Sequence, residues 1–148
     1  GKKGEPILSG KDVNPEIGKA NILKEGNDLI ILGIGPILSE ALEAANSKNV
    51  DQNKVCVVSM GSIKPLDKKF LEEISQKSFK KWIILEEHSL IGGLGSAIIE
   101  WKNDNVIETP EIIRLSAPDK FIHQLGSQKY LRKKLKIDFQ SILNEILK

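Results

Sequence analysis

The feature that most limits the fold of this chain is a series of short apolar segments, separated by stretches with helical spacing. These segments, each bounded by glycine, proline or polar residues, cover residues 28–33, 54–60, 81–87 and 111–116. Continuous apolar runs of this length are typical of strands that are covered on both faces, as in parallel sheets. Residues 17–24 alternate more regularly between apolar and polar, and they are predicted to form an additional strand at the edge of the sheet.

Helices are predicted in the intervals between these strands. Apolar residues recur at intervals of three and four over residues 37–45, 70–74, 94–101 and 139–147. Asp67 and Asp138 are predicted to cap the helices that follow them, and a separate short helix is predicted over residues 127–135. Strands that alternate with helices predict an α/β protein, built as a three-layer α/β/α sandwich with right-handed crossovers.

The composition argues against several classes of function. The 22 basic and 20 acidic residues give a net charge of +2, which is too balanced to indicate binding to nucleic acid or to a membrane surface. Two histidines and one cysteine lie too far apart for a usual zinc site, so no metal site is predicted. The single cysteine, Cys56, allows no internal disulfide, and no apolar stretch is long enough to span a bilayer. We therefore expect a cytoplasmic protein without a signal peptide.

One loop stands out at the carboxyl ends of the predicted strands, where open α/β sheets usually bind ligands. Its candidate site residues are Glu87, His88, Gly92, Gly93, Gly95 and Ser96. One interpretation is an anion site on the free amides of the helix start, or acid–base chemistry by Glu87 and His88. The favoured interpretation is structural: the glycines allow a tight turn and close packing, while Glu87 and His88 satisfy backbone amides locally or contact a neighbouring domain.

A second candidate is a basic cluster near the C-terminal end. It consists of Lys129, Arg132, Lys133 and Lys134. Such a cluster either docks an acidic partner or forms a solvated helix face, and the second interpretation is the more common one. Aromatic residues are sparse around it, which argues against nucleic acid.

The remaining loops predict no catalytic centre. The Gly33-x-Gly35 segment does not continue as a dinucleotide-binding fingerprint, because Leu38 occupies the position of the third glycine. Lys64 stands beside the Asp67 cap, where a capped helix start is favoured over an anion contact. No G-x-S-x-G elbow occurs, and Cys56 lies within an apolar run where a thiol is normally inert. We therefore predict no catalytic residue in this chain.

Several motifs, taken in order, resemble the C-terminal domain of the transketolase family. This family includes transketolase, deoxyxylulose-phosphate synthase and the small subunit of 2-oxoacid dehydrogenase decarboxylases. The resemblance extends over nearly the whole chain and rests on the segments Ile17-Gly18-Lys19-Ala20, Ile63-Lys64-Pro65-Leu66-Asp67, Leu85-Glu86-Glu87-His88-Ser89, Gly92-Gly93-Leu94-Gly95-Ser96-Ala97, Asp119-Lys120-Phe121-Ile122 and Gly126-Ser127.

The resemblance implies both an architecture and a role. It implies a five-stranded, mostly parallel sheet whose one antiparallel strand lies at residues 17–24. Residues 1–16 would be an extended lead-in from a preceding domain, and residues 17–148 the transketolase C-terminal-type domain. Thiamine diphosphate and magnesium would be held by the pyrimidine-binding and diphosphate-binding domains or subunits, and no cofactor by this chain.

The implied function is structural support of the catalytic domains and of a dimer, in an enzyme that transfers ketol units between sugar phosphates. Two alternatives stay open. Glu87-His88 with the glycine turn leans toward the transketolase and deoxyxylulose-phosphate synthase branch. The alternatives are the C-terminal domain of the small subunit of a 2-oxoacid dehydrogenase decarboxylase, docking an acyltransferase core, and a free-standing binding or regulatory module. The substrate of the parent enzyme and the extent of its polypeptide are left open by the sequence.

Overall fold

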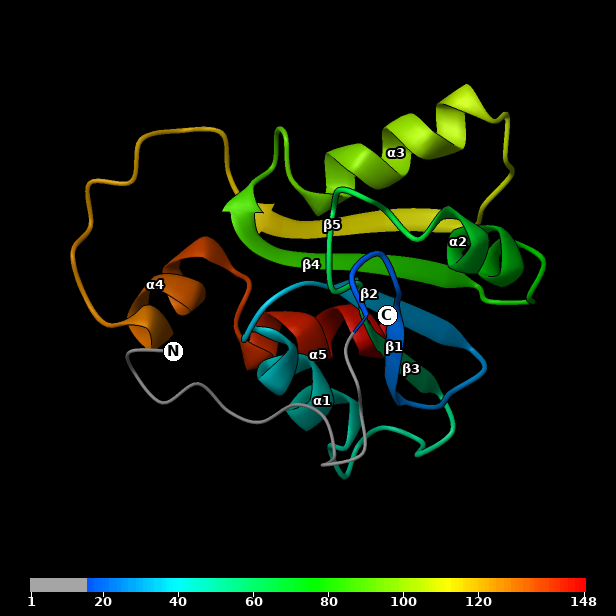
Figure 1. Cartoon of the computed structure of the whole chain (residues 1–148). Helices are drawn as coiled ribbons and strands as arrows, with labels where there is room; N and C mark the ends of the chain where they lie inside the picture. The colour runs from blue at the N-terminus through cyan, green and yellow to red at the C-terminus, as the bar shows by residue number, and fades with distance from the viewer. Residues whose placement is uncertain (1–15) are drawn as a thin grey trace.

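The computed structural model describes residues 16–148. Five strands within this part of the chain form one mixed sheet (Figure 1). The strands are β1 (Asn21–Lys24), β2 (Leu29–Gly33), β3 (Val55–Ser59), β4 (Lys81–Ser89) and β5 (Glu111–Ala117). Their spatial order is β1-β3-β2-β4-β5. Strand β1 pairs with β3 in antiparallel orientation, whereas the other neighbours are parallel. The predicted sheet, with its antiparallel strand at one edge, is confirmed.

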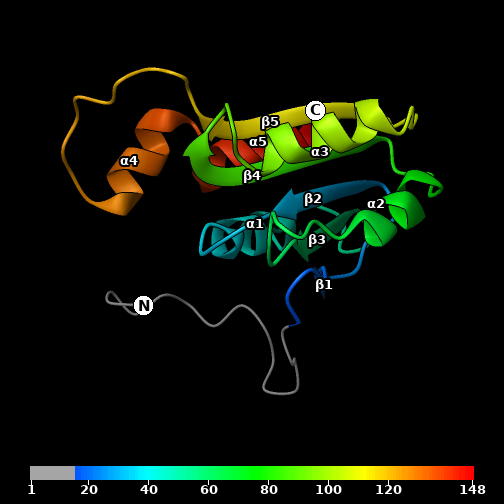
Figure 2. The same ribbon diagram turned by 45° about the horizontal axis from the view of Figure 1, so that its top comes forward.

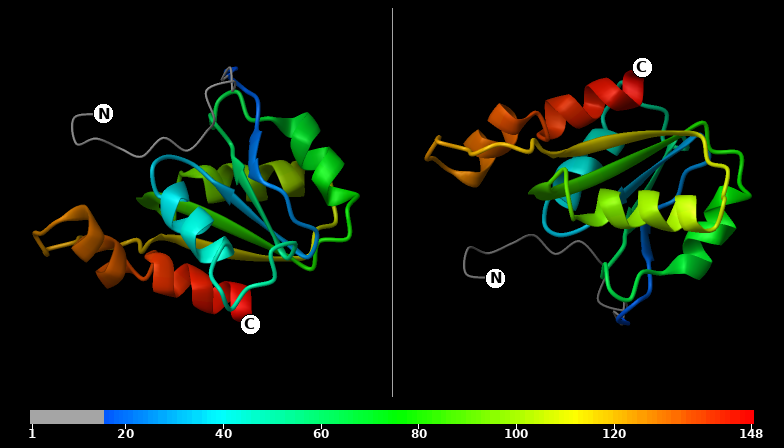
Figure 3. Two further views of the ribbon diagram at one scale, coloured as in Figure 1. Left: turned by 90° about the horizontal axis from the view of Figure 1, so that it is seen from below. Right: turned by 90° about the horizontal axis from the view of Figure 1, so that it is seen from above.

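Helices cover both faces of this sheet. They are α1 (Leu38–Ala45), α2 (Lys68–Ser75), α3 (Leu94–Asp104), α4 (Gln128–Leu135) and α5 (Phe139–Leu147). Helices α1 and α5 pack on one face, and α2 and α3 pack on the other (Figure 3). Helix α4 lies beyond the end of the sheet at which β4 and β5 terminate (Figure 2). The result is the predicted three-layer sandwich.

The central strand β2 shows why the apolar runs are continuous. Leu29 and Ile31 belong to the cluster under α1 and α5, whereas Ile30 and Leu32 belong to the cluster under α2 and α3. Successive side chains point to opposite faces, and both faces are covered, so each position is buried. Full burial of one such side chain contributes about 1.5–3 kcal/mol.

Three of the helices have an N-cap residue whose side chain accepts a hydrogen bond from an amide of the first turn. The Asp67 carboxylate accepts from the Phe70 amide at 3.1 Å, and the Asp138 carboxylate accepts from the Ser141 amide at 3.3 Å. Both predicted caps are therefore confirmed. The Asp67 carboxylate also accepts from the Ala20 amide at 2.9 Å, which fastens the start of α2 to the segment before β1.

Strand β1 is shorter than predicted. It begins at Asn21, because the chain turns at Ile17 and Gly18 before it enters the sheet. Gly18 has a φ of +81°, and its amide donates to the Ser62 hydroxyl at 3.0 Å instead of to a neighbouring strand. The proposed lead-in over residues 1–16 lies, apart from Glu16, outside the described residues. Within residues 16–148, no helix is both long and apolar enough to cross a membrane.

Candidate functional site

A buried carboxylate closes the start of α3, at the carboxyl edge of the sheet. The side chain of Glu86 is fully buried, and its two oxygens accept from the amides of Leu94 at 2.6 Å and Gly95 at 3.0 Å. The Ser116 hydroxyl donates to the same carboxylate at 3.3 Å. Free amides and the helix dipole stabilise negative charge here, and Glu86 supplies it from within the chain. The position that a bound anion would need is thus occupied by Glu86.

Glycine is required at two positions around this carboxylate. A Cβ atom on Gly93 would lie 2.0 Å from Oε2 of Glu86, and one on Gly95 would lie 2.6 Å from Nε of Arg114. The close-packing interpretation of the glycine loop therefore agrees with the structure. Gly92 has a φ of +80°, and its amide donates to the Ser96 hydroxyl at 2.9 Å. The group that satisfies the helix amides is Glu86, however, and not Glu87 or His88. The alternative, that Glu87 and His88 contact a neighbouring domain, stays a prediction.

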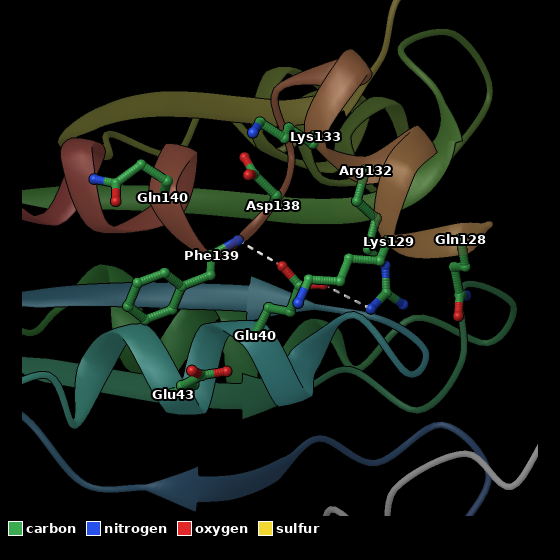
Figure 4. Close-up of a pocket in the computed structure, with 9 residues that line it drawn as sticks. All are labelled: Glu40, Glu43, Gln128, Lys129, Arg132, Lys133, Asp138, Phe139 and Gln140. Carbon is green, nitrogen blue, oxygen red and sulfur yellow. Dashed lines mark hydrogen bonds and ion pairs between the residues drawn. The ribbon is translucent and has the colours of Figure 1, made fainter. Parts of the chain in front are cut away.

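Glu87 instead anchors helix α4 to the end of β4. Nε of Arg132 donates to Glu87 Oε1 at 2.8 Å, and one of its terminal nitrogens donates to Oε2 at 3.0 Å. The other terminal nitrogen donates to Glu40 of α1 at 2.9 Å, and Glu40 also accepts from the Phe139 amide of α5 at 2.5 Å (Figure 4). This network joins one strand to three helices.

The charge of Arg132 is stabilised by its position in this network. Its side chain is only 9% exposed. The hydrogen bonds that Arg132 donates to Glu87, together with the one that it donates to Glu40, raise the pKa of Arg132 above its ordinary value, although burial opposes this rise. A guanidinium fork held by two carboxylates is the geometry that favours arginine over lysine.

The basic cluster is therefore divided between the interior and the surface. Lys129, Lys133 and Lys134 are exposed as predicted, but Arg132 is buried and does not belong to an exposed docking face. A hollow of about 620 Å³ beside it is lined by Lys129 and Lys133 together with the acidic side chains of Glu40, Glu43 and Asp138 (Figure 4). Because both signs of charge line this hollow, it offers no uniform attraction to an acidic partner.

The other candidate residues lie apart from one another. His88 is exposed, with Nδ1 3.1 Å from the Ser89 carbonyl oxygen, and His123 is exposed in the loop after β5. Burial within β3, together with the nearby charge of Glu25, raises the pKa of the Cys56 thiol to about 11, so this thiol is inert near neutral pH. Among residues 16–148, no group of three His, Cys, Asp or Glu side chains is placed to hold a metal ion.

An exposed apolar loop is the site feature that the sequence interpretation missed. Phe121 is 90% exposed and Leu125 is 96% exposed, and Ile122 between them is 40% exposed. This loop borders a hollow of about 520 Å³ whose lining includes Glu87 and Ser89 of β4. Neighbouring exposed apolar side chains mark an interaction surface. The sequence shows that these apolar residues are present. It does not show that they are exposed, because their exposure depends on where the loop lies relative to the sheet.

The strand order, together with the glycine loop whose amides bind Glu86, defines an α/β sandwich domain. At the carboxyl edge of its sheet, Glu86 and Glu87 are bound by other residues of the same chain. The family model described as "Transketolase, C-terminal domain" matches residues 18–142, and the chain belongs to this family. A solved structure described as a split-gene transketolase, in an inactive β4 tetramer, superposes with a TM-score of 0.83 at 29% identity, covering 97% of this chain and 46% of that one. Transketolase from Campylobacter jejuni shares the fold, with a TM-score of 0.64 at 17% identity over 95% of this chain and 20% of that one.

Curated relatives match along most of the chain. The 1-deoxy-D-xylulose-5-phosphate synthase of Caldanaerobacter subterraneus subsp. tengcongensis is 37% identical over 147 residues, which are 99% of this chain and 23% of the relative. The enzyme of the same name from Halothermothrix orenii is 38% identical over 133 residues, which are 89% of this chain and 20% of the relative. The chain thus spans about a fifth of the length of these relatives.

Proposed function

We propose that this chain is the C-terminal domain of a thiamine-diphosphate-dependent enzyme of the 1-deoxy-D-xylulose-5-phosphate synthase or transketolase type. The observation that carries the proposal is the 37% identity to a 1-deoxy-D-xylulose-5-phosphate synthase over 99% of the chain. The enzyme would transfer ketol units between phosphorylated sugars in the cytoplasm. This domain would support the catalytic domains and a dimer, without a catalytic residue of its own.

The cofactor belongs, on this proposal, to the pyrimidine-binding and diphosphate-binding domains or subunits. Thiamine diphosphate supplies the carbanion chemistry of ketol transfer when it is bound. The glycine loop at the start of α3 does not fit the cofactor, because the helix amides already bind Glu86 and the Glu87 carboxylate is paired with Arg132. On this proposal, the residues of this chain take no part in the reaction itself.

The exposed loop after β5 is the surface that we assign to contact with those other domains or subunits. Phe121 and Leu125 present large apolar side chains to solvent at the carboxyl edge, next to the hollow near Glu87. Burial of each such side chain in an interface is worth about 1.5–3 kcal/mol. In the relatives, about four-fifths of the length lies outside the part that matches this chain. Domains of that total size are large enough to cover the loop.

An assay of the intact enzyme that carries this sequence tests the proposed reaction. We expect formation of 1-deoxy-D-xylulose 5-phosphate, or ketol transfer between sugar phosphates, with dependence on added thiamine diphosphate. Omission of the segment that corresponds to this chain is expected to abolish assembly and activity together. Activity with 2-oxoacids and an electron acceptor alone would instead place the parent among the 2-oxoacid dehydrogenase decarboxylases.

A paired substitution tests the assigned contact surface. In the intact enzyme, Phe121→Ser combined with Leu125→Ser should weaken assembly, measured as mass by light scattering during gel filtration. Val106→Ser is the matched control, because Val106 is 89% exposed but follows α3 at another part of the domain. An unchanged mass in the double variant, or an equal loss in the control, would contradict the assignment.

A docking role for the exposed lysines is the second candidate function. Lys133 and Lys134 are exposed on α4, which is held in place by Arg132. Replacing both lysines with glutamate should abolish capture of an acidic protein partner while the domain still folds. Retained capture would remove this candidate, and the ketol-transfer assay would be unaffected by that result.

A further inference from the structure

A separate hollow at the carboxyl end of β5 is lined by neutral and positively charged residues alone. Its volume is about 330 Å³, and Lys120, Lys134 and Lys136 contribute the charged side chains. Gln124 adds an amide, and Ile122 adds an apolar wall. This volume lies at the lower end of the range for small-molecule pockets, about 300–1,000 Å³. The carboxyl edge of the parallel strands is also where such sheets bind ligands.

The lysines reach this hollow from two segments, helix α4 and the loop after β5. Lys134 belongs to the last turn of α4, and Lys136 follows in the left-handed conformation, with a φ of 58°. Helix α4 is itself held by the paired Arg132, so the two lysines are carried on an anchored element. Lys120 comes from the loop after β5.

The 620 Å³ hollow shows that this uniform charge is not general around α4. Lys129 and Lys133 line the 620 Å³ hollow together with Glu40, Glu43 and Asp138, whose carboxylates offset their charges. No carboxylate lines the 330 Å³ hollow among the described residues. Lys120 also lines the 520 Å³ hollow, where Glu87 and Asp119 offset part of its charge. Lys134 and Lys136 share the 330 Å³ hollow without a carboxylate in its lining, so their ammonium groups repel one another, and a bound anion relieves this repulsion.

We propose that the Lys120–Lys134–Lys136 hollow binds the phosphate group of a small phosphorylated metabolite. The lysines supply point charges and N–H donors for phosphate oxygens, and the Gln124 amide supplies a further donor. Ser116 also lines the hollow, but its hydroxyl donates to Glu86 and is not available to the ligand. The apolar wall at Ile122 suits the carbon skeleton of the metabolite.

A titration of this chain with glycerol 3-phosphate tests the site, followed by two-dimensional ¹H–¹⁵N NMR. Saturable shifts are expected at the backbone amides of Lys120, Gln124 and Lys136. Glycerol, and sodium chloride at matched ionic strength, should produce no saturable shifts. The experiment reads binding directly, so it is independent of the ketol-transfer proposal.

Two variants complete the test. The double variant Lys120→Gln, Lys134→Gln should bind glycerol 3-phosphate about a hundredfold more weakly, at about tenfold for each charge-assisted hydrogen bond. Lys129→Gln is the control from the neighbouring hollow and should leave the affinity unchanged, and both variants should retain the wild-type urea midpoint. Shifts that sodium chloride reproduces, or an equal loss of affinity in Lys129→Gln, would overturn the proposal.

Discussion

Arg132 of α4 and Glu87 at the end of β4 are joined by two parallel hydrogen bonds of 2.8 and 3.0 Å, across 45 positions of sequence. Helix α4 contributes no other residue to the buried set than this arginine. The helix is attached to the domain through this charged pair, through Gln128, whose Nε2 donates to Glu87 at 3.1 and 3.2 Å, and through Leu135, which packs against the cluster under α1 and α5. The position of everything that α4 carries, including its lysines, depends on these contacts.

Replacing Arg132 with methionine should destabilise the domain by about 2 kcal/mol, because it removes the positive charge that Glu40 and Glu87 share. The estimate is below the range for fully buried pairs, since the side chain of Glu87 is 29% exposed. Urea unfolding followed by circular dichroism measures the loss. Lys133→Met, on the exposed side of the same helical turn, should change the free energy of unfolding by no more than about 0.5 kcal/mol. Equal effects of the two substitutions would contradict the anchoring role.

Gly93→Ala should destabilise the domain by about 3 kcal/mol, because the new methyl group would lie 2.0 Å from the Glu86 carboxylate. Backbone strain does not contribute, since Gly93 has a φ of −94°. Gly92→Ala is the matched comparison: its φ is +80° and its surroundings are open, so only about 1–2 kcal/mol of backbone strain is expected. Thermal unfolding of both variants measures the two losses of stability. A smaller loss for Gly93→Ala than for Gly92→Ala would argue against the close contact.

Val106→Gly should stabilise the domain by about 1 kcal/mol. Val106 follows α3 with a φ of 53°, and its amide and that of Ile107 bond back to the carbonyl oxygens of Asn103 and Lys102. This is the helix-ending motif in which glycine is preferred, since a β-branched residue is strained in the left-handed region. Val106→Ala retains the positive φ and serves as the control, with a much smaller gain in melting temperature. A melting temperature that falls on the glycine substitution would refute the prediction.

Cys56 should make the stability of the domain decline at alkaline pH. Its thiol has a pKa of about 11 in the folded chain against an ordinary value of 9.0, so between these values the unfolded state releases a proton that the folded state retains. The contribution is fully present below about pH 9 and is lost as the pH rises toward 11, with a slope of up to about 1.4 kcal/mol per pH unit.

The comparison with Cys56→Ala isolates this effect. The stability advantage of the wild type over the variant, measured by urea unfolding, should shrink across that pH window. Alkylation of the native thiol by iodoacetamide at about pH 8 should also be slow and should accelerate once urea unfolds the chain. A constant difference between the two proteins across the window would show that the thiol ionises equally well in both states.

The strands and helix caps could be predicted because their causes are local. An apolar run such as residues 28–33 and a cap such as Asp67 act through neighbours a few positions away. The family resemblance rested on the order of several such local motifs, and the family match over residues 18–142 agrees with it. The exact start of β1 could not be predicted in this way, because it depends on the contact of Gly18 with the distant Ser62.

The chain by itself thus determined the alternation of strands and helices, the glycine loop and the presence of lysines near its C-terminal end. Only the tertiary structure decided that Glu86 and not Glu87 closes α3, because neighbouring residues of a strand point to opposite faces and a shift of one position exchanges them. It likewise decided that Arg132 is buried while Lys133 beside it is exposed. The burial of a charge depends on partners such as Glu40, 92 positions away, which are brought within hydrogen-bonding distance only when the helices pack.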